Sequence, residues 1–168
     1  HGGPGSTHNY FAPLERLAEE RTVVLYDQIG CGRSDRPQDI EWSVGVFCDE
    51  LLAVRDQLGL DRIHLLGSSW GGMLALEHAL SCAEGILGLV LSSTLASVDE
   101  WAAEQRRLRA ALPAAVVEVL DRHESAGTYD DPEYERAMEA FFDRHFYRGP
   151  KPRPELERMA AEKSTEVY

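Results

Sequence analysis

Apolar side chains recur every three or four residues in two stretches of the first hundred positions, which is the spacing of one helical face. They are Phe11, Leu14, Leu17 and Ala18 in the first stretch, and Phe47, Leu51, Val54 and Leu58 in the second. We therefore predict helices over 11–20 and 46–58. Gly59 is placed to end the second helix, because glycine readily adopts the left-handed conformation that follows a helix.

Short apolar runs bounded by turn residues alternate with these helices. The runs lie at 22–26, 62–67 and 85–93, and a further helical pattern at 73–80 follows the second of them. Short β-branched and leucine-rich runs of this kind are typical of buried strands. The order strand, helix, strand, helix, strand predicts an α/β fold with a parallel sheet flanked by helices.

The composition changes beyond Ser97 to Ala, Glu and Arg at helical spacing, without β-branched runs. Ser97 and Glu100 have the spacing of a capping box that opens a helix, and the pattern is broken near Gly127 and at 149–154. We expect a partial α/β core over 1–96 and a helical cap subdomain over 97–168. The chain starts at His1 with a loop-like segment and has no initiator methionine, so we expect it to be a fragment that is incomplete at both ends.

Composition and charge exclude several classes of function. The chain has 168 residues, 43% of them hydrophobic, and a formal net charge of −12. This charge argues against nucleic-acid and anionic-lipid partners. No apolar run approaches the roughly 18 residues of a membrane span, and three widely spaced cysteines indicate a reducing compartment. We expect a cytoplasmic protein with no membrane or nucleic-acid partner.

The segment GSSWG at 67–71 matches GxSxG and lies between a predicted strand and a predicted helix. On such a tight turn the Ser69 hydroxyl projects from the edge of the sheet as a nucleophile. The same turn places the backbone N–H of Trp70 at a helix N-terminus, where it can stabilise an oxyanion. Ser and Gly are also ordinary turn residues, so it is the position between strand and helix that favours the catalytic interpretation.

The opening segment HGGPG at 1–5 offers the second oxyanion donor that acyl transfer requires. In serine hydrolases with this turn, that donor comes from a glycine-rich loop after an early strand. We assign it to the backbone N–H of Gly3. Taken alone, HGGPG is better explained as a flexible turn, but the two motifs occur in the expected order with a predicted helix and strand between them.

Three segments together resemble a known family: HGGPG at 1–5, DQIGCGRS at 27–34 and GSSWGG at 67–72. They are similar to the proline iminopeptidases and related L-amino-acid amidases, which are serine aminopeptidases of the α/β-hydrolase fold, and YDDPEY at 129–134 resembles their cap. The resemblance implies release of an N-terminal residue from a small peptide or amino-acid amide through an acyl-enzyme. It implies Ser69 as the nucleophile, and Gly3 and Trp70 as oxyanion donors. The family's triad Asp and His follow the cap, outside this chain, as does the cap glutamate that binds the substrate amine.

No histidine of the chain is assigned as the base for Ser69. The six are His1, His8, His64, His78, His123 and His145. The first two belong to the opening loop, the next two lie in a predicted strand and helix, and the last two are typical surface or packing histidines. No HxxxH or HExxH spacing is present, so we expect neither a metal nor an organic cofactor.

The loop that follows the first predicted strand, at 28–38, lacks both GxGxxG and a GKS/T ending, which argues against a nucleotide site. We interpret Asp27 and Arg33 there as structural, through local hydrogen bonds, and Cys31 as a packing residue. In the cap, Tyr134, Met138, Phe141 and Phe142 share one side of a predicted helix over 132–147. Most of this stripe is core packing, although one or two of the aromatic rings are candidates for lining a small apolar pocket.

Two alternatives to the aminopeptidase remain open. The same turn serves esterases and carbon–carbon hydrolases, which act on substrates without a free amine. A non-catalytic fragment, surviving only as an interaction module, is the alternative from a different class, because the chain lacks an identifiable base for Ser69.

Overall fold

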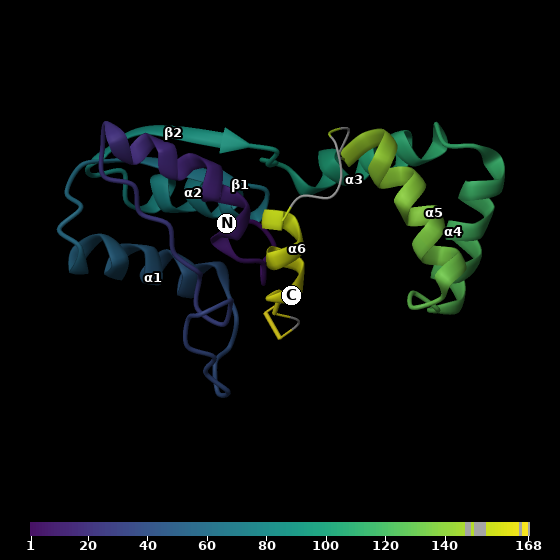
Figure 1. Ribbon diagram of the computed structural model, residues 1–168, viewed down its shortest axis with the longest axis horizontal. Helices are drawn as coiled ribbons and strands as arrows, with labels where there is room; N and C mark the ends of the chain where they lie inside the picture. Colours follow the sequence, from purple (N-terminus) through teal and green to yellow (C-terminus); the bar gives the residue numbers. More distant parts are fainter. Residues whose placement is uncertain (147–148, 150–153, 165, 168) are drawn as a thin grey trace. The chain divides into compact units, whose positions relative to one another are not determined.

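The computed structural model describes residues 1–146, 149, 154–164 and 166–167. The chain forms two compact units (Figure 1). One comprises His1–Ala96 together with Pro152–Tyr168, and the other comprises Ser97–Lys151. The last residues therefore belong with the first unit, which differs from the expected division at 97–168.

The first unit is built on two parallel strands, β1 (Ile63–Ser68) and β2 (Ile86–Ser92). Their register places Leu66 opposite Val90, and both strands lie within one or two residues of the predicted runs. The third predicted strand, at 22–26, is not part of the sheet. A strand requires a hydrogen-bonded neighbour, and the described residues provide this run with none.

Helices cover the sheet and bury its core. α2 (Trp70–Ser81) packs on both strands, and α1 (Val44–Gln57) packs on α2. The side chain of Ser43 caps α1 by accepting a hydrogen bond from the Val46 amide, and Gly59 adopts a φ of +63° just beyond its end. A cluster of buried side chains fills the unit, namely Cys31, Phe47, Leu74 and Val167.

The helix expected over 11–20 is instead a 3-10 helix, η1 (His8–Glu19). Pro13 lies inside it and has no amide hydrogen to donate to the turn before it, which disfavours a regular α-helix. The side chain of Thr7 caps its start and accepts a hydrogen bond from the Asn9 amide.

The segment after residue 153 returns to the first unit through α6 (Pro154–Ala161), which packs on η1. Asn9 Nδ2 donates to Glu162 Oε2 at 2.8 Å, and the Ser164 amide donates to the Gly5 carbonyl at 2.7 Å. Val167 is 7% exposed. These bonds and this buried side chain are the physical reason that residues 154–167 are not part of the helical unit.

The second unit is helical, as the composition predicts. It contains α3 (Val98–Ala110), α4 (Ala114–Ala126) and α5 (Pro132–Phe141), continued by a π-helical turn, η2 (Phe142–Phe146). The Ser97 side chain caps α3 by accepting from the Glu100 amide at 3.3 Å, and Gly127 ends α4 with a φ of +68°.

The aromatic stripe predicted on 132–147 packs inside the second unit. Tyr134, Met138 and Phe141 lie against the buried cluster of Leu112, Leu120 and Ala137. Phe142 is 39% exposed, and residue 147 lies outside the described residues. Among the helices that the structure describes, none has both the length and the apolar character needed to cross a bilayer.

Candidate active site

Ser69 occupies the sharp turn between β1 and α2, where the sequence motif predicts it. Its φ of 53° and ψ of −123° are rarely adopted by residues other than glycine. The surrounding backbone imposes this conformation. The Ser69 amide donates to the Ser92 carbonyl at 2.9 Å, and the Ser69 carbonyl accepts from the Gly72 amide at 2.9 Å and from Thr94 Oγ1 at 2.7 Å. The Ser69 side chain itself is exposed.

The glycines around Ser69 are required by close backbone approach. A Cβ atom at Gly67 would overlap with the Gly71 carbonyl oxygen, and one at Gly72 would lie 2.5 Å from the Thr94 Cβ. The first turn of α2 therefore lies directly against the end of β1, which is the arrangement that lets a nucleophile project from the sheet edge.

The opening HGGPG loop lies against this turn. A Cβ atom at Gly2 would be 3.2 Å from the Ser69 Cβ, and one at Gly71 would be 2.5 Å from the His1 carbonyl oxygen. Within the described part of the chain, the Gly3 amide donates no hydrogen bond. The amide of Trp70, at the first position of α2, has no acceptor within its helix. The structure thus brings Ser69, Trp70 and the loop that carries Gly3 together.

A set of hydrogen bonds holds the opening loop in place. The Gly2 amide donates to Tyr10 Oη at 2.6 Å, and His1 Nδ1 donates to the Gly2 carbonyl at 2.9 Å. The Gln28 amide donates to His1 Nε2 at 2.8 Å, which fixes the proton of the neutral ring on Nδ1. Burial raises the pKa of Tyr10, although hydrogen bonds with Ser68 and Gly2 oppose the shift.

The side chain of Gln28 connects the loop to Trp70. Its Nε2 donates to the His1 carbonyl at 3.2 Å, and its Oε1 accepts from Trp70 Nε1 at 3.2 Å. The sequence interpretation did not identify Gln28, Tyr10 or Thr94. For Gln28 a signal exists, because it follows a predicted strand at the edge where α/β sites form; Tyr10 and Thr94 carry none.

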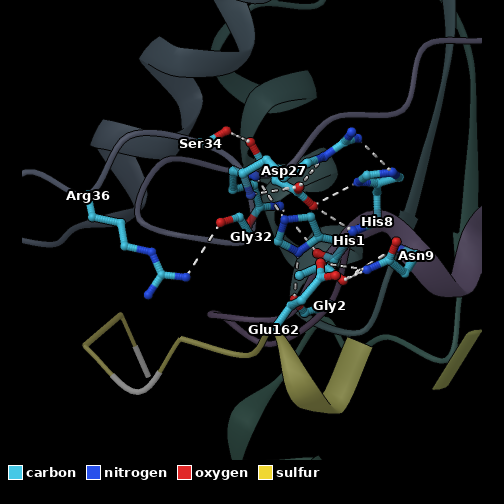
Figure 2. Close-up of polar contacts among 12 residues, drawn as sticks. His1, Gly2, His8, Asn9, Asp27, Gly32, Ser34, Arg36 and Glu162 are labelled. Atoms are coloured by element: carbon cyan, nitrogen blue, oxygen red, sulfur yellow. Dashed lines mark hydrogen bonds and ion pairs between the residues drawn. The ribbon is translucent and has the colours of Figure 1, made fainter. Parts of the chain in front are cut away.

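Asp27 organises the neighbouring loop, as Figure 2 shows. Its Oδ1 accepts from the amide and from Nδ1 of His8, at 2.9 and 2.8 Å, and its Oδ2 accepts from the Arg33 amide at 3.1 Å. Burial acts to raise the pKa of Asp27, but the bonds from His8 and Arg33 outweigh burial and lower it. These contacts confirm the predicted structural roles of Asp27 and Arg33.

A half-buried carboxyl group and a buried thiol lie beside this loop. Glu50 Oε1 accepts from the Ile29 amide at 2.6 Å, and burial raises the pKa of Glu50 to about 7 despite that bond. Cys31 is fully buried, and burial raises the pKa of its thiol to about 11. A thiol with a raised pKa is a poor nucleophile at neutral pH, which agrees with the packing role expected for Cys31.

Three of the four histidines of the first unit, His1, His8 and His78, hydrogen bond to groups other than Ser69. His1 and His8 use both ring nitrogens, His8 Nε2 facing an Arg33 N–H at 3.4 Å. His78 is buried and accepts from Arg55 Nη1 at 3.1 Å, and His64 is exposed beside Gly88. None of these four hydrogen bonds to Ser69 in the part of the chain that the structure covers.

The second unit contains one cluster of metal-ligand type among its described residues. One ligand atom each from His123, Asp131 and Glu133 lie within 4.8 Å of one another. A guanidinium nitrogen of Arg122 hydrogen bonds to Glu133 Oε2 at 2.5 Å and lies 3.4 Å from His123 Nε2. Two of the three candidate ligands, Glu133 and His123, therefore already face a cationic side chain.

Comparison with known proteins gives a family and named relatives. A model of the alpha/beta hydrolase fold family matches residues 1–126. A proline iminopeptidase of Clostridium botulinum is 45% identical over 172 residues. The crystal structure of a proline iminopeptidase of Mycobacterium smegmatis superposes with a TM-score of 0.88 at 42% identity, and that of VinJ with a TM-score of 0.90 at 42% identity.

The matches cover almost all of this chain but only part of each relative. They span 100% of the chain and 59% of the Clostridium botulinum protein, and 96% of the chain and 56% of each of the two solved structures. The fold class expected from the sequence, and the resemblance carried by its three motifs, are confirmed by these findings.

Proposed function

The chain belongs to the α/β hydrolase fold family, and from that premise we propose that it carries the nucleophile and the oxyanion hole of a serine aminopeptidase of the proline iminopeptidase type. The observation that carries the proposal is the conformation of Ser69. It is held at a positive φ on a strand-to-helix turn, with the HGGPG loop packed against it. Strain of this kind persists where the surrounding structure enforces it, and it is frequent at active sites.

In the proposed reaction, Ser69 Oγ attacks the carbonyl carbon of the substrate's first residue. The backbone N–H groups of Gly3 and Trp70 stabilise the negative charge that develops on the carbonyl oxygen. Collapse of the tetrahedral intermediate releases the shortened peptide or the amine and leaves an acyl-enzyme, which water then hydrolyses. We assign the general base to a histidine outside residues 1–168, since the relatives extend beyond the matched segment.

The proposed substrate is a small peptide or amino-acid amide with a free amino terminus. The relatives named as proline iminopeptidases support this class, and the net charge of −12 suits a cationic amine. None of the proposed steps requires a metal or an organic cofactor. The three cysteines are free, which supports a cytoplasmic location.

The test is turnover of a prolyl anilide by the full-length protein that carries this chain. We expect Ser69→Ala to lower kcat at least about a thousandfold and to abolish labelling by a fluorophosphonate. Ser81→Ala is the matched control, because Ser81 is an exposed helix residue whose hydroxyl donates to the backbone carbonyls of Glu77 and His78. Unchanged turnover in Ser69→Ala would remove Ser69 from the mechanism.

A second comparison separates the aminopeptidase from the esterase alternative, which the same strand-to-helix turn would serve. Acetylation of the substrate amine should abolish turnover by an aminopeptidase. If the acetylated substrate, or a simple acyl ester, reacts at the same rate, the esterase reading replaces the one proposed. If no substrate reacts and Ser69 is not labelled, the protein is a non-catalytic module.

A further inference from the structure

One buried side chain spans the two parts of the site that carry the proposed oxyanion donors. Gln28 is 2% exposed, and both ends of its amide are hydrogen bonded. Nε2 donates to the His1 carbonyl and Oε1 accepts from the Trp70 indole, each at 3.2 Å. Its backbone amide makes a third bond, to His1 Nε2 at 2.8 Å.

These bonds define a single orientation of the amide. A carbonyl oxygen can only accept and an indole N–H can only donate, so rotating the amide by half a turn would oppose two oxygens at His1 and two donors at Trp70. The His1 ring is fixed as well, because its Nδ1 is used by the Gly2 carbonyl. Gln28 therefore has one arrangement that satisfies all its partners, and it connects the opening loop to the first residue of α2.

We propose that Gln28 is a positioning residue that holds the loop carrying Gly3 and the turn carrying Trp70 at a fixed separation. This inference rests on the proposed function, in which those two residues supply the donors. The donors come from segments far apart in the sequence, and stabilisation of an oxyanion requires both to lie within hydrogen-bond distance of one atom. A bridge between the segments sets that distance before substrate arrives.

A positioning role and a packing role predict different effects on kcat and KM. Loss of the bridge weakens stabilisation that exists only in the transition state, so kcat falls while KM is nearly unchanged. Gln28→Met keeps the length and much of the volume of the side chain but makes neither bond. Gln28→Glu keeps the acceptor for Trp70, but when ionised it places negative charge against the His1 carbonyl. When protonated, the same side chain can donate to that carbonyl and restore the bridge.

The experiment measures kcat and KM for a prolyl anilide in the full-length protein, alongside fluorophosphonate labelling of Ser69. We expect Gln28→Met to lower kcat about 10- to 100-fold, which is less than the roughly 100- to 1,000-fold loss from removing an oxyanion donor itself, with KM changed less than about threefold. As the pH is lowered from 8 to 5, the glutamate of Gln28→Glu becomes protonated, so the activity of this variant relative to wild type should rise at least about tenfold. Gln38→Met is the control, because Gln38 is exposed and the one side-chain hydrogen bond that it makes to a described residue is to the Arg36 carbonyl.

Trp70→Phe, which removes the indole N–H and keeps the backbone N–H, completes the test. Gln28 acts partly through that indole. The fold-reduction in kcat of the double variant Gln28→Met/Trp70→Phe should therefore be smaller than the product of the fold-reductions of the two single variants. Two results would overturn this inference and leave the proposed function standing. One is a wild-type kcat in Gln28→Met, and the other is an activity of Gln28→Glu relative to wild type that is the same at pH 8 and pH 5. Wild-type protein that neither turns over the anilide nor labels at Ser69 would overturn the proposed function and this inference with it.

Discussion

Oδ1 of Asp27 and Nδ1 of His8 are joined by a hydrogen bond of 2.8 Å, with the carboxylate almost wholly buried. The bond connects the start of η1 to the loop that follows residue 27. Since a carboxylate only accepts, the bond places a proton on His8 Nδ1. The ring is thereby fixed as a structural group, and this pair holds the loop next to Gln28.

We expect Asp27→Asn to lower the free energy of unfolding by about 1–3 kcal/mol, the range for a buried polar group left with the wrong partner. The new amide would place N–H groups against the Arg33 amide, which now donates to Oδ2. Urea denaturation measures the change, with Asp39→Asn, at an exposed position, as the control.

The pKa of Asp27 is lowered below its ordinary value of 3.8, so its ionised form stabilises the fold above that pH. The difference between Asp27→Asn and wild type should therefore shrink as the pH falls below about 4.

Stability should also fall in mildly acidic solution because of His78. This ring is fully buried and accepts from Arg55, and burial together with the nearby guanidinium lowers its pKa from 6.5. Below pH 6.5 the unfolded chain binds a proton that the folded ring resists, so the free energy of unfolding decreases by up to about 1.4 kcal/mol per pH unit. His78→Gln keeps an acceptor for Arg55 and does not titrate. Denaturation at a series of pH values between 7 and 5 should give a shallower dependence for that variant; equal slopes would contradict the assignment.

Ser69→Gly should unfold at a higher temperature than Ser69→Ala. Both substitutions remove the hydroxyl, but alanine keeps a Cβ at a φ of 53° whereas glycine adopts this conformation without a steric cost. The strain at such a residue is of order 1–3 kcal/mol, and part of it is offset by the greater freedom of glycine in the unfolded chain. We expect a difference of a few degrees in Tm, measured by calorimetry. An equal or lower Tm for the glycine variant would mean that the turn is not strained.

Two glycines of the first unit should respond differently to alanine. At Gly67 the added methyl group would overlap with the Gly71 carbonyl, and we expect a loss of more than about 2 kcal/mol. At Gly59 no atom of the described residues lies within 4 Å of an added Cβ, so the opposition to alanine comes from the φ of +63°, at a cost of about 1–2 kcal/mol. Comparable denaturation midpoints for the two variants would show that the approach of α2 to β1 is looser than described.

The sequence predicts the secondary-structure elements around Ser69 better than the long-range contacts that hold them in place. The strand, the turn and the helix around Ser69 follow from local patterns, because apolar periodicity and small residues determine them over short distances. The 22–26 run shows the limit of this reasoning. Its residues favour a strand, but pairing depends on a neighbouring strand, which no local pattern reveals.

Local patterns also do not predict the hydrogen-bond partners of Tyr10 and Gln28, even though the position of Gln28 after a predicted strand is itself a signal. Each side chain bonds to a backbone group many residues away, so its role depends on the folded path of the chain. The return of Val167 to the core is similar, since a single valine in a polar stretch gives no periodicity. In contrast, the cap of α3 at Ser97 depends on a contact three residues away, and the sequence predicts it.

The hydrogen bond from the Ser164 amide to the Gly5 carbonyl has a consequence for the order of events during synthesis. The opening loop is synthesised before the helical unit, whereas Ser164, which holds the loop, is synthesised after it. On the ribosome this contact therefore cannot form until the whole of Ser97–Lys151 and the residues up to Ser164 have been synthesised. Proteolysis of stalled nascent chains should find residues 1–5 cleaved readily until the segment around Ser164 has emerged.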